Sequence, residues 1–415
     1  MKAGAGKAEF SLPPKYLEIE DFVVVHRTLN ARALVLEDGA KWILVSLELT
    51  SMPDEEAWAL QKAIAERFRV DEGHIWICVT HTFSAPHFWS DTVLADSKKI
   101  AQKRRFRENL HRATMQALEK AFLTLGQVKV GLGCGYSSVN VNRDIQTEDG
   151  WWVGTKGLGL SDHQVYTLRI DKENGEPLAV LFHYAIQSSV LHGSRLSAGG
   201  KAVTPDVAGI ACAHIEKNMP GAVAIFLIGA SGDQAPIEKA VQETFVRGER
   251  VRTDRKEEGF GICESLGESL GETVRQTAQR LECIEACKEL TFGRREFPVP
   301  GQKMEQELAE LRPKTVPEYE SCGDRTAVVE AIGIGELVFV GVKPELNCAS
   351  GVTLQTLSPY AHTLVCTMVN GSAKYMAQRD AYERSTYEAM NSVYGKGAAE
   401  ILIRETLGLL AEMRK

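Results

Sequence analysis

The sequence lacks long hydrophobic runs and a strong excess of either charge. No apolar run approaches the ~18 residues of a membrane span, and the first residues hold no apolar segment of signal-peptide length. The formal net charge of -7 over 415 residues gives no electrostatic reason to expect nucleic acid or an anionic membrane as a partner. These absences predict a cytoplasmic protein that binds neither nucleic acid nor membrane, and they leave assembly into a homo-oligomer open.

The sequence is also without closely spaced cysteine pairs, internal repeats or low-complexity tracts. It has nine cysteines, an odd number, and their spacings are not those of metal sites. Both features are expected of a protein in a reducing compartment. A chain of this length can form several domains or one large α/β unit, and its only linker-like stretch, within residues 243–260, is highly charged. We expect a single domain over residues 1–415, with 243–260 as an exposed charged insertion.

The hydrophobic patterns indicate an α/β fold in which mixed β-sheets are flanked by helices. Residues 31–47 form two strand-like runs around Asp38-Gly39, a strong hairpin signal. A helical pattern over 53–68, a buried strand that ends just before His81, and a long helix to Phe122 follow in that order. Further strands are expected at 127–132, 164–170, 178–182, 222–228, 327–332, 336–342 and 363–369, and further helices at 208–217, 265–281, 303–311 and 398–412.

Polar loops follow several of these strands and hold candidate functional residues. In open α/β sheets, ligands bind beyond the carboxyl ends of strands, and His81 lies there after the apolar run Ile75–Val79. The run 222–228 leads into a glycine-rich loop that contains Asp233, whose carboxylate could cap a helix, bind a cation or orient a histidine. Glu345 also follows a strand directly. The expected position of these loops favours a shared site.

An arginine and two tyrosines add further candidates. Arg143 lies in a polar loop, where its guanidinium could clamp a carboxylate or stabilise an oxyanion. The structural alternative is a salt bridge with Asp144 or Asp162. Tyr375 and Tyr387, near the end of the chain, offer phenols as metal ligands or proton donors.

Taken in order, these segments resemble the catalytic N-terminal domain of the neutral/alkaline non-lysosomal ceramidase family over nearly the whole chain. The family's additional C-terminal domain is not expected. The resemblance implies a hydrolase with two sets of functional residues. The implied ligands of zinc or another divalent metal are His81, Glu345 and Tyr375. The implied catalytic residues are Arg143, Tyr387 and, in the loop of the family's nucleophile, Asp233.

The chain departs from the family pattern at three positions that carry chemistry. Phe83 stands in place of a catalytic histidine, Gln187 in place of a zinc-binding histidine, and Ala235 in place of the nucleophilic serine. Because alanine cannot attack a carbonyl, neither the family mechanism nor ceramide as substrate is expected. Further pocket candidates, two of them histidines that could replace the missing ligand, are Gln187, His87, His192, Asn142 and Gln234.

Three hypotheses about function remain. The first is hydrolysis of a small polar amide or ester by metal-activated water, with Arg143 and Tyr387 stabilising the oxyanion. The second is a metal-independent lyase or isomerase that acts on a carbohydrate or uronic acid, with His81, Arg143 and a tyrosine moving protons and holding the substrate. The third is a binding protein without catalysis. Each of them has a small molecule as its ligand.

Overall fold

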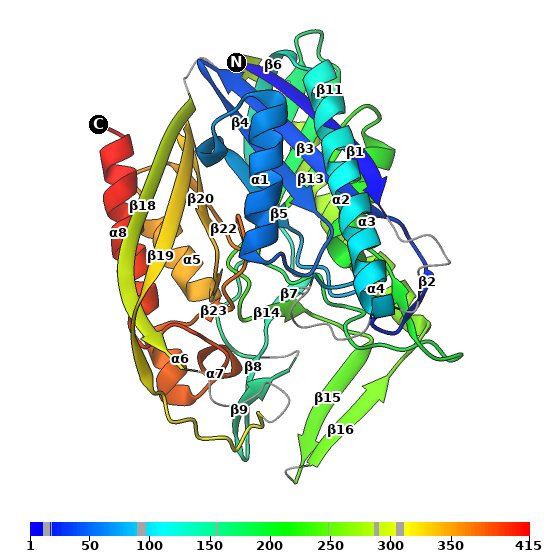
Figure 1. The fold of residues 1–415 in the computed structure, drawn as a ribbon, viewed down its shortest axis with the longest axis vertical. Helices are drawn as coiled ribbons and strands as arrows, with labels where there is room; N and C mark the ends of the chain where they lie inside the picture. Colours follow the sequence, from blue (N-terminus) through cyan, green and yellow to red (C-terminus); the bar gives the residue numbers. More distant parts are fainter. Residues whose placement is uncertain are drawn as a thin grey trace.

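The computed structural model describes residues 1–10, 17, 19–88, 97–154, 157–247, 249–285, 290–303 and 311–415. It has the mixed α/β architecture that the sequence predicts. Two β-sheets pack against each other, and helices cover their outer faces (Figure 1).

The larger sheet has nine strands in the order β13-β11-β10-β6-β1-β3-β4-β5, with β17 paired to β6. The predicted hairpin is β3–β4, and Gly39 in its turn has a φ of +71°, which glycine adopts without steric cost. The pairs β4–β5 and β11–β13 are parallel. The strands of this sheet are β1 Lys2–Phe10, β3 Leu29–Asp38, β4 Ala40–Leu47, β5 Ile75–Val79, β6 Gly126–Tyr136, β10 Gln164–Lys172, β11 Pro177–Tyr184, β13 Val223–Ile228 and β17 Ile284–Glu285.

The smaller sheet has four strands in the order β18-β19-β20-β22. Its inner face shares one hydrophobic cluster with the larger sheet. In that cluster the ring of Trp42 lies 5.1 Å from Phe339 and 5.4 Å from Trp76, measured between ring centroids. The apolar faces of both sheets are therefore buried against each other. The strands are β18 Leu290–Gln302, β19 Ser321–Ile334, β20 Leu337–Val342 and β22 His362–Cys366.

Helices cover the outer faces of both sheets (Figure 1). Helices α1 and α2 pack on β3, β4 and β5, helices α3 and α4 on β11 and β13, and α5 and α8 on the smaller sheet. The helices are α1 Asp54–Phe68, α2 Ser97–Leu123, α3 Asp206–Asn218, α4 Glu258–Arg280, α5 Cys348–Leu357, α6 Arg379–Arg384, α7 Tyr387–Met390 and α8 Ala398–Met413, with a short 3-10 helix at Glu72–His74.

Short strand pairs connect the loops that follow the main strands. The loops after β20 and β22 pair through β21 and β23, and the loop after β13 pairs with β7 through β14. A parallel bridge between Thr82 and Ser188 joins the loops after β5 and β11. The candidate residues are thereby drawn to one end of the molecule. The short pairs are β2 Phe22–Val25 with β12 Lys201–Val203, β7 Asn140–Asn142 with β14 Gln234–Pro236, β8 Asp144–Thr147 with β9 Gly150–Val153, β15 Val241–Val246 with β16 Glu249–Asp254, and β21 Glu345–Leu346 with β23 Tyr375–Met376.

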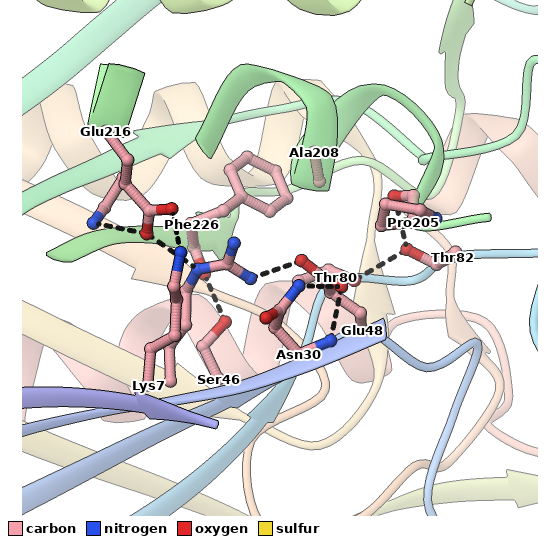
Figure 2. Close-up of polar contacts among 12 residues, drawn as sticks. Lys7, Asn30, Ser46, Glu48, Thr80, Thr82, Pro205, Ala208, Glu216 and Phe226 are labelled. Carbon is pink, nitrogen blue, oxygen red and sulfur yellow. Dashed lines mark hydrogen bonds and ion pairs between the residues drawn. The ribbon is translucent and has the colours of Figure 1, made fainter. Parts of the chain in front are cut away.

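A buried ion pair ties the strands to helix α3 (Figure 2). Arg32 of β3 pairs with Glu48, which follows β4, and its Nε lies 3.5 Å from a carboxylate oxygen of Glu216 in α3. Lys7 of β1 reaches the same carboxylate at 2.5 Å, and Glu48 also accepts a hydrogen bond from the amide of Asn30 at 2.6 Å. The residues that follow β4 are therefore fixed in place, and they hold the loop that contains His81.

Two regions of the chain differ in form from the sequence-based expectation. Residues 243–260 are mostly the hairpin β15–β16, which projects from the body of the molecule in Figure 1, and α4 begins at Glu258. The charged stretch is therefore ordered as strands and the start of a helix. The helix expected at 303–311 lies almost entirely outside the described residues. Among the described helices, none is both long and apolar enough to cross a membrane.

Candidate functional site

His81 lies directly beyond the carboxyl end of β5, as predicted, and its backbone has a positive φ. Its φ is +54°, which is uncommon for a residue other than glycine. Its Nδ1 lies 2.6 Å from the carbonyl oxygen of Thr50, so Nδ1 donates a proton there. Its Nε2 lies 3.2 Å from a carboxylate oxygen of Glu345, yet it makes no hydrogen bond to any described residue. The imidazole is therefore buried with one nitrogen facing a carboxylate.

Arg143 is the centre of the polar network. Its Nε and Nη2 donate to Glu388 at 2.8 and 2.6 Å, its Nη1 donates to the side-chain oxygen of Gln187 at 2.8 Å, and Nη2 also donates to the Tyr375 hydroxyl at 3.1 Å. Every side of the guanidinium that faces the protein is thus held by a specific partner, which fixes its orientation.

The carboxylate that pairs with Arg143 is Glu388, so the expected alternative of a salt bridge with Asp144 or Asp162 is wrong. Asp144 instead faces Glu388. Burial, followed by the charge and hydrogen bond of Glu388, raises the pKa of Asp144 to about 10. Asp144 is therefore protonated at neutral pH, and its proton lets two buried carboxyl groups lie together behind Arg143.

A cavity of about 490 Å³, the size of a small-molecule site, lies beside this network. Its lining comes from Arg143 directly after β7, from β14, and from the hairpins β8–β9 and β15–β16. Five sequence-derived candidates line it: Arg143, Gln187, His192, Tyr375 and Tyr387. Ala235, the position of the missing serine, also lines it, together with Phe83, Trp152, Val153, Gly154, Gly193, Lys239, Val241, Glu243 and Arg252.

The two tyrosines border the guanidinium. The centre of the Arg143 guanidinium lies 5.4 Å from the ring centroid of Tyr375 and 5.5 Å from that of Tyr387. Trp152 contacts Tyr387 edge to face, with centroids 5.5 Å apart. Burial raises the pKa of both phenols, so both remain protonated and can donate hydrogen bonds. The cavity thus combines a fixed cation, neutral phenols and aromatic surface.

Asp233 does not line this cavity. Its carboxylate accepts hydrogen bonds from the amide of Cys348 at 2.7 Å and from the side chain of Asn142 at 3.0 Å. Gln234 is buried and donates to the carbonyl of Leu160 at 3.0 Å. These contacts connect the start of α5 to β7 and β14. We therefore correct the expectation of a catalytic Asp233: Asp233, Asn142 and Gln234 position the loops.

The two histidines expected as replacement ligands have other partners in the structure. His87 contacts Glu20 at 2.7 Å and lines a neighbouring cavity. The ring of His192 contacts Phe83, with centroids 4.4 Å apart. Burial, and next the charge of Lys239, lowers the pKa of His192 to about 3, so this imidazole is neutral.

The donor set does not fit a catalytic zinc site, which needs three protein ligands with free electron pairs. His81 and Glu345 supply two such donors. Gln187 turns its NH₂ group toward Glu345, donating to it at 2.9 Å, and its oxygen is held by Arg143. The Tyr375 hydroxyl accepts a hydrogen bond from Arg143. The described residues hold no group of three or more His, Cys, Asp or Glu that could bind a metal.

The sequence pattern does not single out Lys239 or Glu388, and it offers Trp152 only as one of several tryptophans that could stack on a sugar ring or pack in the core. Lys239 and Trp152 reach the cavity through loops and hairpins that carry no motif, and Glu388 lies 245 positions from the arginine that it orients. The only signal in the sequence was the position of Lys239, four residues after Ala235 in the loop that lost its serine.

The fold and this site define the chain as an α/β protein with the architecture of the neutral ceramidases. A solved structure described as "Ceramidase complexed with C2" has a TM-score of 0.76 at 16% identity. The match covers all of this chain and 75% of the ceramidase chain. The structure of the neutral ceramidase from Pseudomonas aeruginosa has a TM-score of 0.73 at 18% identity, and the match covers all of this chain and 74% of that one. No protein-family model and no curated protein matches the sequence. The expected ceramidase-like fold is confirmed.

Proposed function

We propose that this protein hydrolyses a small amide or ester that carries a negative charge. The observation that carries the proposal is Arg143, a permanent cation that faces the cavity and is fixed by Glu388, Gln187 and Tyr375. An oriented guanidinium beside neutral phenols can hold a carboxylate or stabilise the oxyanion that forms when a carbonyl is attacked. The hydrolase class is supported by the fold, which is shared with ceramidases.

Water is the attacking group in this proposal. Ala235 offers no nucleophile where the resemblance places the serine, and none of the described residues that line the cavity is a serine. Because the donor set does not fit zinc, no step is assigned to a metal. Arg143 holds the developing negative charge, and Tyr387 donates a hydrogen bond to the same oxygen. The volume of about 490 Å³ is enough for a small substrate.

The test is a panel of N-acetyl amino acids, each paired with its neutral carboxamide, assayed for release of acetate. We expect hydrolysis of the anionic members in preference to the neutral ones. Arg143→Met is expected to lower kcat/KM by roughly 10²- to 10³-fold, the effect of losing an oxyanion donor. Absence of hydrolysis across the panel and across matched acetate esters contradicts the proposal.

A second candidate is proton transfer on a carboxylated sugar, without a metal. Trp152 favours it, because an aromatic side chain beside Arg143 in one cavity can stack on a sugar ring while the arginine holds its carboxylate. Incubation with uronic acids in D₂O tests this candidate: deuterium incorporation, absent in Arg143→Met, supports it over hydrolysis. Binding of a uronic acid with neither exchange nor hydrolysis supports a protein without catalysis.

A further inference from the structure

One lysine of the cavity has no partner. Lys239 lies between β14 and β15, and the backbone on either side of it is fixed: the amide of Ile237 donates to Val139 and that of Ala240 donates to Val190, both at 2.9 Å. Within the part of the chain that the structure describes, its ammonium makes no hydrogen bond and no ion pair. The adjacent Glu238 pairs with Arg255 instead. Lys239 is therefore a positioned amine in the wall of the cavity.

The surroundings of Lys239 favour the neutral amine. Burial, and next the charge of Arg143, lowers the pKa of Lys239 to about 8, against the opposing influence of Glu243 and Asp206. Lysines in such environments, desolvated and beside another cation, serve as bases and nucleophiles at neutral pH. A substantial fraction of Lys239 is thus unprotonated in mildly alkaline solution.

Three neighbouring groups of the cavity, His192, Tyr375 and Tyr387, have pKa values shifted away from that of Lys239. His192 has its pKa lowered to about 3, both tyrosines have theirs raised, and arginine stays protonated. Glu243 pairs with Arg252 at 3.8 Å across the hairpin. The charges that act on Lys239 are those of Arg143, Glu243 and Asp206. The other titratable or charged groups that line the same cavity are His192, Arg252, Tyr375 and Tyr387.

We propose that Lys239 is the general base that activates the attacking water in the cavity where Ala235 provides no nucleophile. This inference rests on the proposed hydrolysis. The water oxygen bonds to the substrate carbonyl carbon, one water proton moves to Nζ of Lys239, and the carbonyl electron pair moves to the oxygen held by Arg143. When the tetrahedral species collapses, the bond to the leaving amine or alcohol breaks and the ammonium of Lys239 protonates that group. The neutral amine is restored.

A base explains the site better than a nucleophilic lysine does. Direct attack by Nζ on an ester or amide would leave an acyl group on the lysine through a new amide bond, which is as stable as the substrate. Proton transfer leaves no such product and needs no additional reactant.

The experiment compares the pH dependence of kcat and KM in the wild type, Lys239→Met and Lys239→Arg, with the fastest N-acetyl amino acid of the panel. The wild type is expected to gain activity with an apparent pKa near 8. Lys239→Met is expected to lose at least 100-fold in kcat, together with this pH dependence. Lys239→Arg keeps the charge but cannot become neutral, so it should not restore kcat, and added methylamine should partly restore Lys239→Ala. Lys217→Met, at an exposed site, is the control.

A second readout does not depend on activity. Competitive acetylation with acetic anhydride, read by mass spectrometry across pH, is expected to modify Lys239 with a midpoint near pH 8, and the exposed Lys217 is followed in the same digest as the reference. Hydrolysis with an unchanged pH profile in Lys239→Met, or full activity in Lys239→Arg, overturns the base role alone. No hydrolysis by the wild type overturns the proposed function and the base role together.

Discussion

At the scale of single residues, Gln187 decides what kind of site this is. Its NH₂ group donates to Glu345 and its oxygen accepts from Arg143, so it connects the buried carboxylate of Glu345 to the arginine that lines the cavity. Where a metal would attract Glu345, an amide hydrogen bond does so here. A neutral amide therefore occupies the place of a third ligand.

Gln187→His is expected to create a zinc site with His81 and Glu345, because it supplies the third electron-pair donor. We expect at least a tenfold gain in zinc affinity over the wild type, measured by competition with a chromophoric chelator. Gln187→Leu, which removes the amide without adding a ligand, is the matched control and should bind no better than the wild type. Equal affinity of the wild type and Gln187→His contradicts our reading of the donor set.

Asp144 predicts a specific dependence of stability on pH. Its pKa is raised from 3.8 to about 10 in the folded protein. Between these values the folded state binds a proton that the unfolded state has lost, so this contribution to stability is complete below pH 4 and is lost as the pH rises toward 10. Asp144→Asn keeps a hydrogen-bond donor toward Glu388, but the asparagine side chain does not gain or lose a proton as the pH changes.

We expect the stability of Asp144→Asn relative to the wild type to increase with pH, by up to about 1.4 kcal/mol per pH unit. Urea unfolding at pH 5, 7 and 9 measures this difference. Asp380→Asn, in an exposed pair with Arg384, is the control for the substitution itself. A constant difference for Asp144→Asn would mean that Asp144 is ionised in the folded protein.

At the scale of elements, the pair Arg32–Glu48 fastens β3 and the segment after β4 to α3. Both side chains are almost completely buried. Glu48→Ala leaves the guanidinium buried without its main partner, which is expected to lower the free energy of unfolding by about 3–5 kcal/mol. Arg32→Met with Glu48→Leu should recover most of this loss. Glu383→Ala, in an exposed pair, is the control, with less than about 1 kcal/mol expected in urea unfolding. A similarly small loss for Glu48→Ala contradicts the importance of the pair.

The hairpin β15–β16 has a local role at the cavity. Its strands pair only with each other, and its base contributes Val241, Glu243 and Arg252 to the cavity wall. Replacing residues 244–251 with Asn-Gly keeps Glu243 opposite Arg252 and is expected to change the free energy of unfolding by less than about 0.5 kcal/mol.

Arg252→Ala in the full-length hairpin should raise KM for anionic substrates about fivefold, the effect of losing one partly exposed charge, with kcat unchanged. Kinetics on the anionic and neutral members of the panel measure both parameters. A large loss of stability in the shortened hairpin would show that its outer part supports the fold.

At the scale of the whole molecule, the two sheets share one core, which predicts a single cooperative unit as the sequence analysis expects. Trp42, Trp76 and Phe339 lie at the junction of the sheets. Phe339→Ala is expected to cost about 3–5 kcal/mol, with unfolding by tryptophan fluorescence and by circular dichroism still coincident. Leu123→Ala, at a side chain that is 85% exposed, is the control. Two separate transitions in the wild type contradict a single unit.

The sequence by itself determined the elements and the loops in which the chemistry lies. The Asp38-Gly39 hairpin, the strand before His81 and the helices near 208–217 and 398–412 follow from hydrophobic periodicity and turn residues, which act between near neighbours in the chain. The same local information identified Arg143 and Tyr375 as candidates, because each lies in a polar loop near a predicted strand. Gln187 became a candidate only through the resemblance to the family.

Only the tertiary structure decided which of these residues act together. It paired Arg143 with Glu388 rather than with Asp144, placed Asp233 among the loop contacts, and brought Lys239 into the cavity. These choices join residues far apart in sequence, 245 positions apart for Arg143 and Glu388. They depend on how the two sheets pack and how their loops cross, and a local pattern of residues contains no information about that geometry.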